Sequence, residues 1–222
     1  MKIFILILSI VFVSFLVNGQ ENKLSYGISS SIDIDYFYFK PYFEHYNPEK
    51  AFSSYNIGFR FQYNLRNQLS LRSGLSYSKK EITCGLYPIS PSDDQYAKLK
   101  TYYLNIPLML CFKDNFKGRF HLCPSLGIST GILLGNTEKD YSAWGIEQRS
   151  DGFLNQDLNK AILSVQISLG FEYNFGDKTY VSIEPYFGHG INKMSNELMA
   201  ANSNSLGGIV SINYIIKKKN SL

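Results

Sequence analysis

Some residues of this 222-residue sequence have the types that acyl transfer needs, namely a nucleophile, a base and an acid. The candidates are His189, Asp33, Asp35, Ser203 and Ser205, and the other two histidines are His45 and His121. Their spacing forms no catalytic motif, and the sequence has no metal-ligand spacing, phosphate loop or nucleotide fingerprint. We therefore predict no catalytic residue, no cofactor and no metal site.

Four charged residues occupy positions whose neighbours in the same register are mostly Ser, Gly and Asn: Arg60, Arg72, Glu172 and Glu184. Two cations and two anions in a confined space would form ion pairs, whereas each one unpaired would cost several kcal/mol. We predict an ion-pair network among them, with a selective ion path as the alternative.

The sequence has three cysteines, at positions 84, 111 and 123. A three-residue hairpin loop at 116–118 would place Cys111 opposite Cys123, at a separation that a disulfide allows. We predict this disulfide, with Cys84 left over in a long loop. The alternative is that Cys111 and Cys123 are two small residues that fill space.

The elements that must position these residues are strands, because apolar and polar residues alternate with a period of two. The stretch 102–112, "YYLNIPLMLCF", has large apolar residues at all its even positions. Alternation of this kind predicts eight strands, at 24–38, 54–65, 69–79, 101–113, 119–134, 160–175, 179–189 and 205–217. Pro107, Pro124 and Pro185 fall inside three of them, where we expect β-bulges.

Short and long connections alternate between these strands. The turns at 66–68, 114–118 and 176–178 are short, and the connections at 40–53, 80–100, 135–159 and 190–204 are long. This order predicts an all-β, eight-stranded antiparallel up-and-down barrel with both termini at the short-turn end. In it, the two arginines lie across the lumen from the two glutamates, nearer the short-turn end.

The two faces differ in a way that indicates a membrane barrel. The polar face is rich in Ser, Gly and Asn, which suit a crowded lumen, and the other face carries Leu, Ile, Val and Phe with Tyr near strand ends. A soluble, lipocalin-like carrier with an apolar interior is the alternative. The formal net charge of +4 at pH 7 is too small to indicate nucleic-acid binding.

The start of the chain predicts export. Lys2 is followed by an apolar run from Ile3 to Val17 and a small-residue exit at Gly19, which is typical of a secretory signal peptide. We predict cleavage after Gly19, with the barrel domain at 20–222. A membrane anchor is the alternative, but the run is shorter than the roughly 20 residues that span a bilayer.

Four stretches carry a resemblance to a known family: "YYLNIPLMLCF", "FHLCPSLGIS", "LNKAILSVQISLGFEYNF" and "VSIEPYFGHGINK". They resemble the outer-membrane β-barrel domain of Bacteroidota, the PorT-like group, over about 100–190. The resemblance implies a barrel in the outer membrane of the cell envelope, and the group includes proteins that assist secretion. The end of the chain, "IIKKKNSL", departs from the terminal aromatic of many such barrels.

We expect a monomer in contact with outer-membrane lipid, with a plugged lumen and a structural or surface-binding role. The loop 135–159 holds the only Trp, and aromatics among polar residues suit recognition of a partner: Tyr141, Trp144 and Phe153. An accessory role in envelope secretion is the second possibility, and a lipid-modifying enzyme of the outer membrane is the third. A surface or periplasmic protein partner is not identified by the sequence.

Overall fold

The chain forms one antiparallel sheet that closes on itself. The computed structural model describes residues 24–37, 51–66, 68–86, 95–114, 118–141, 147–148, 158–195 and 202–216. The strands are β1 (Leu24–Tyr36), β2 (Ala51–Asn64), β3 (Leu69–Leu86), β4 (Gln95–Phe112), β5 (Phe120–Tyr141), β6 (Glu147–Gln148), β7 (Ala161–Asn174), β8 (Thr179–Gly190) and β9 (Asn204–Ile216).

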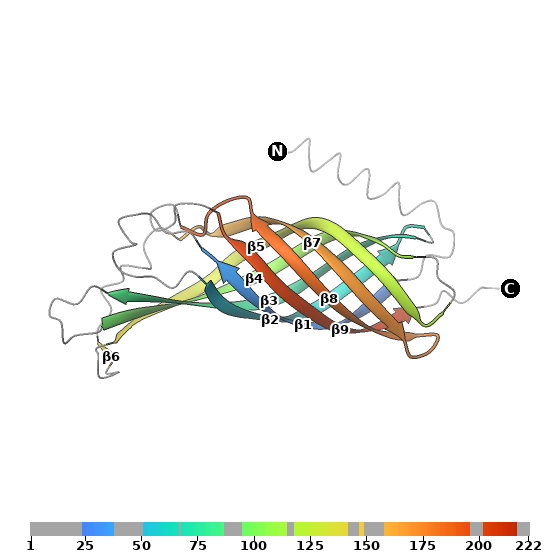
Figure 1. Ribbon diagram of the computed structural model, residues 1–222, viewed down its shortest axis with the longest axis horizontal. Helices are drawn as coiled ribbons and strands as arrows, with labels where there is room; N and C mark the ends of the chain where they lie inside the picture. The colour runs from blue at the N-terminus through green and yellow to red at the C-terminus, as the bar shows by residue number, and fades with distance from the viewer. Residues whose placement is uncertain are drawn as a thin grey trace.

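Neighbours along the chain are neighbours in the sheet, whose order is β4-β3-β2-β1-β9-β8-β7-β5-β6. Since β4 also pairs with β5, eight strands form a closed barrel, and the short β6 pairs with β5 alone (Figure 1). The ladder between β1 and β9 runs from Leu24 opposite Ile216 to Tyr36 opposite Asn204. The predicted eight-stranded antiparallel barrel is confirmed. Among the described residues, no helix is long and apolar enough to cross a membrane.

The barrel has its polar residues inside and its apolar residues outside. On β1, Ser25, Asp33 and Asp35 are buried in the lumen, whereas Ile28 and Ile32 on the other face are 59% and 72% exposed. This pattern is the reverse of the one in a water-soluble barrel, so the wall is suited to contact lipid.

Tyrosines mark the outer limit of the apolar wall. Tyr55, Tyr77 and Tyr102 lie on neighbouring strands, and the rings of Tyr77 and Tyr102 stack at 6.0 Å. On β4 the apolar wall extends from Tyr102 to Phe112, which at a usual strand rise and tilt is a height of roughly 25 Å. That height matches the apolar band of transmembrane barrels, also about 25 Å.

Three strands extend well past their predicted ends. β3 continues to Leu86, β4 begins at Gln95 and β5 reaches Tyr141, so these strands extend beyond the others at one end (Figure 1). The connections expected at 80–100 and 135–159 are therefore partly strand. Beyond the apolar wall the outer face carries charged residues such as Glu81 and Lys100, so the apolar outer face that indicated the strands ends there.

The prolines do not produce the expected bulges. The ladders on either side of Pro107 and Pro185 each keep one register past the proline. Pairing is interrupted only locally, on one side of each proline. Pro124 lies just beyond the last pair of the β4–β5 ladder, Cys111 with Ser125. The register shift in β4–β5 occurs between Tyr102 and Tyr103 instead. A missing N–H is thus tolerated by omitting a hydrogen bond, without an extra residue.

Candidate functional site

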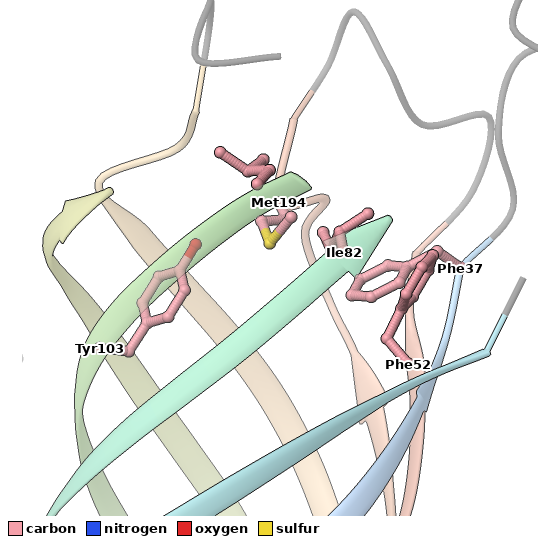
Figure 2. Packing of buried hydrophobic residues seen from close by; sticks show 6 residues of the cluster. Phe37, Phe52, Ile82, Tyr103 and Met194 are labelled. Atoms are coloured by element: carbon pink, nitrogen blue, oxygen red, sulfur yellow. The ribbon is translucent and has the colours of Figure 1, made fainter. Parts of the chain in front are cut away.

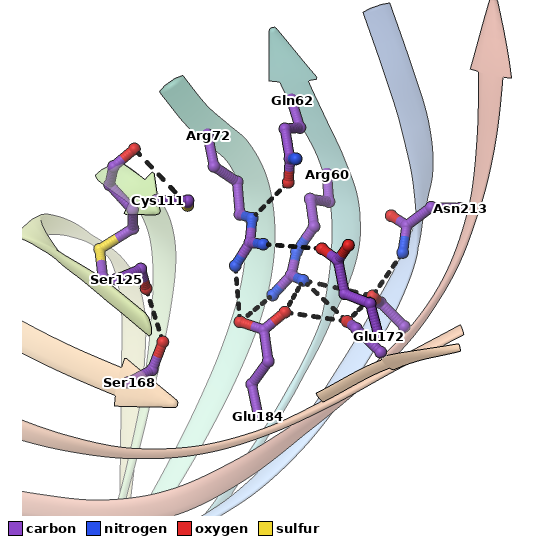
Figure 3. A network of polar contacts seen from close by, with 12 residues as sticks. Arg60, Gln62, Arg72, Cys111, Ser125, Ser168, Glu172, Glu184 and Asn213 are labelled. Atoms are coloured by element: carbon purple, nitrogen blue, oxygen red, sulfur yellow. Dashed lines mark hydrogen bonds and ion pairs between the residues drawn. The ribbon is translucent and has the colours of Figure 1, made fainter. Parts of the chain in front are cut away.

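Two arginines and two glutamates from opposite walls meet in the lumen (Figure 3). Arg60 lies on β2 and Arg72 on β3, whereas Glu172 lies on β7 and Glu184 on β8. In the closed strand order β2 faces β7 and β3 faces β8, and alternation turns all four side chains inward. The structure therefore brings together the four charges that the sequence singled out.

Glu184 is the centre of this network. Its Oε1 lies 2.5 Å from Nη1 of Arg60, and its Oε2 lies 2.7 Å from Nη1 of Arg72 and 3.3 Å from Nη2 of Arg60. Ser182 also donates a hydrogen bond of 2.8 Å to Oε1. Glu184 is 1% exposed, and both of its carboxylate oxygens have charged partners. These ion pairs offset the cost of removing the carboxylate from water, so that it can remain charged.

Glu172 is held by a cation that the sequence reasoning did not single out. Nζ of Lys113 lies 2.8 Å from Oε2 of Glu172, whereas Nη2 of Arg72 lies 3.6 Å from Oε1. Lys113 follows β4 on the same odd register as Cys111, so its inward position could have been inferred. With Lys113, three cations surround the two carboxylates.

Neutral polar residues complete the network, and a small residue makes room for it. Gln62 accepts a hydrogen bond of 3.0 Å from Nε of Arg72, and Ser211 accepts one of 3.2 Å from Nη1 of Arg60. A Cβ at Gly170 would come within 3.2 Å of Cγ of Glu184 and 3.3 Å of Cβ of Cys123. Packing around Gly170 is therefore close, on the side of the lumen where Glu184 and Cys123 lie.

A second layer of side chains lies at the outer mouth of the barrel (Figure 2). It is an apolar cluster, which we call the outer cap, and it comprises Phe37, Phe52, Ile82, Leu99, Tyr103 and Met194, each at most 4% exposed. Its residues come from β2, β3 and β4, from the end of β1 and from the segment after β8.

A cavity of about 150 Å³ lies between the two layers. Its lining includes Arg60, Arg72 and Glu184 at the network and Tyr103 at the outer cap. The rest of the lining is rich in serine. At about 30 Å³ per molecule in the liquid, this space suits a few water molecules.

The structure does not assemble the acyl-transfer candidates. Asp35 accepts hydrogen bonds from Ser54 and Ser205 and pairs with Lys80 at 2.9 Å, all within the lumen. His189 is on the outer face of β8, and its Nδ1 lies 2.7 Å from Oδ1 of Asn204. The histidine and the carboxylates are thus on opposite faces of the wall.

The predicted disulfide is wrong for this structure. Cys111 and Cys123 are free and buried, and Cys111 is paired in register with Ser125. The turn is two residues longer than the assumed hairpin, and Asp114 closes it by accepting hydrogen bonds from the backbone of Leu122 and from His121. Both thiols pack in the lumen as small residues.

Several predicted positions lie outside the described residues. They are the signal peptide at 1–19, His45, Trp144 and Phe153. Tyr141 and Cys84 are described only by their backbone, at the end of β5 and within β3. Cys84 is therefore in a strand and not in the expected loop.

The family comparison agrees with this architecture. The model of the family described as outer membrane protein beta-barrel domain matches residues 18–196, which is most of the chain. The chain belongs to this family. Membership places the protein in the outer membrane, in agreement with the apolar wall.

The chain is similar to proteins whose structures have been solved. The outer membrane protein OprG from Pseudomonas aeruginosa is similar at a TM-score of 0.50 and 11% identity, covering 89% of this chain and 97% of OprG. Ail, the attachment invasion locus protein of Yersinia pestis, has a TM-score of 0.43 and 12% identity, covering 89% of this chain and 100% of Ail. No match was found among curated proteins.

Proposed function

We propose that the protein is an outer-membrane barrel with a plugged lumen and a structural or surface-binding role. The observation that carries this proposal is the double engagement of Glu184 by Arg60 and Arg72 across the lumen. Such a contact joins opposite walls across the lumen. The outer cap adds a second barrier, made of apolar groups that ions do not cross readily.

Conductance in planar lipid bilayers tests the plug. We expect no discrete openings for the wild type and measurable openings for Arg72→Ala combined with Tyr103→Ala, which shortens one residue in each barrier. Arg66→Ala, an exposed arginine next to the short turn, is the matched control and should stay closed. Steady openings of the wild type would contradict the plug, and so would a double variant that stays closed after folding normally.

The surface role rests on the strands that extend outward. β3, β4 and β5 form a sheet beyond the apolar wall, and in the sequence Trp144 and Phe153 come after the end of β5. We propose that Tyr141, Trp144 and Phe153 contact a partner at the cell surface. Alanine at Trp144 and Phe153 should remove cross-linked complexes from intact cells while leaving barrel folding unchanged; retention of the complexes would argue against this role.

An accessory role in secretion is a second candidate, favoured by the resemblance of residues 100–190 to the PorT-like group of Bacteroidota. In a host of that phylum, deletion of the gene should then reduce secreted protein, and normal secretion would contradict the role.

We also propose that residues 1–19 are removed on export and that the mature chain is a monomer. Amino-terminal sequencing of protein from the outer-membrane fraction should begin at residue 20. A mature chain that retains residue 1 would contradict cleavage, and a dimer mass in detergent by light scattering would contradict the monomer.

A further inference from the structure

One carboxylate gathers three lysines on the outer face of the extended strands. Oxygens of Glu81 on β3 lie 3.6 Å from Nζ of Lys79, Lys98 and Lys100 in turn. We call these four residues the lysine cluster. Their side chains are partly exposed, between 25% and 33%. Three positive charges and one negative charge leave the cluster with a net charge of +2 when all are ionised.

The lysine cluster lies at a defined level of the wall. Lys79 comes two residues after Tyr77 and Lys100 two residues before Tyr102, and these stacked tyrosines end the apolar face of the two antiparallel strands. Lys79 is paired in register with Tyr55 and with Tyr102, and its Nζ lies 5.8 Å from the centroid of the Tyr55 ring. Two residues of strand correspond to about 7 Å. Lys79 is thus at the level of the aromatic belt, and Lys100 and Lys98 lie beyond it, where lipid headgroups lie.

An open groove of about 620 Å³ adjoins the cluster on the side of β2. Its lining includes Ile34, Tyr55, Lys79, Glu81 and Thr83. The groove therefore places apolar and aromatic side chains next to the lysine cluster, which it meets at Lys79 and Glu81, at the end of the wall that the long connections mark as extracellular.

We propose that the lysine cluster and this groove bind the phosphate group of an anionic lipid in the outer leaflet. The acyl chains would lie along the apolar wall below Tyr77, and the ammonium groups of Lys79 and Lys100 would donate hydrogen bonds to the phosphate. Charge and level both favour this occupant, since a phosphate in the headgroup layer meets a cluster of net positive charge. The site is on the outer wall and does not depend on whether the lumen conducts.

Native mass spectrometry of the folded full-length protein tests the proposal. The purified protein in a non-ionic detergent is titrated with phosphatidylglycerol or, separately, with phosphatidylcholine. We expect the wild type to retain phosphatidylglycerol preferentially, and Lys79→Gln with Lys100→Gln to weaken this retention on the order of tenfold. Lys98→Gln alone should weaken it partially.

The matched control is Lys160→Gln with Lys193→Gln, which removes the same charge at the same end of the barrel but near β7 and β8. This control should retain the lipid as the wild type does. Equal retention by all variants, equal losses in both double variants, or no preference over phosphatidylcholine would overturn the proposal. Inorganic phosphate at millimolar concentration should not displace the lipid; displacement would assign the site to the free ion. Heat-modifiable migration on gels verifies that each variant is folded.

Discussion

Glu184 accepts ion pairs from two arginines while it is almost completely buried. We predict that Glu184→Gln lowers the free energy of unfolding by about 3–5 kcal/mol, because two buried guanidinium groups lose their shared counter-charge. Urea unfolding in lipid vesicles measures this change.

Glu81→Gln is the comparison for that variant. Glu81 contacts three lysines, but its side chain is 32% exposed, so we expect a loss of only about 0–1 kcal/mol. Equal losses of unfolding free energy in the two variants would mean that burial of the lumen network adds nothing to its contribution to stability.

The positions of the four network charges could be predicted because each follows from the period of two and from the closure of eight strands. Their partners required more than the pattern. Lys113 and Gln62 are inward by the same register, but which cation reaches which carboxylate depends on side-chain length and on the room left by Gly170.

At the scale of elements, the β4–β5 hairpin shows where sequence reasoning fails. A change of turn length by two residues leaves every side chain on its face but exchanges cross-strand partners. Cys111 therefore keeps its predicted inward position and has Ser125 opposite it in place of Cys123.

This register makes a direct prediction. Ser125→Cys should form a disulfide with Cys111 on mild oxidation, because opposed residues of an antiparallel pair lie within disulfide range. A thiol assay on the unfolded, unreduced protein should find two free thiols in this variant and three in the wild type. Ser125→Cys combined with Cys111→Ser is the control and should keep three. A wild type with one free thiol would restore the Cys111–Cys123 pairing.

The strand extensions have a related physical reason. Past the wall the inner face of β3 and β4 becomes apolar, with Ile82 opposite Leu99, whereas the outer face becomes charged. Strand pairing thus continues beyond the lipid-facing wall. A prediction based on apolar lipid-facing residues therefore ends these strands too early.

For the molecule as a whole, we predict that removal of β9, in a chain ending at residue 203, abolishes the heat-modifiable form on gels. Such a chain leaves the edges of β1 and β8 unpaired, which lipid cannot satisfy. A chain ending at residue 216 is the control, since β9 ends at Ile216, and it should keep this form. A heat-modifiable form of the shorter chain would contradict the closure by β9.

The ladder between β1 and β9 has a consequence for the order of events in biogenesis. It joins residues almost a whole chain length apart, such as Leu24 and Ile216, and is the contact of greatest sequence separation in the barrel. Contacts of this kind are slow to form because a long segment must first be ordered. Until β9 has left the export machinery, the edge of β1 that pairs with β9 has no partner. During this interval the exposed edge can pair with a strand of a second nascent chain.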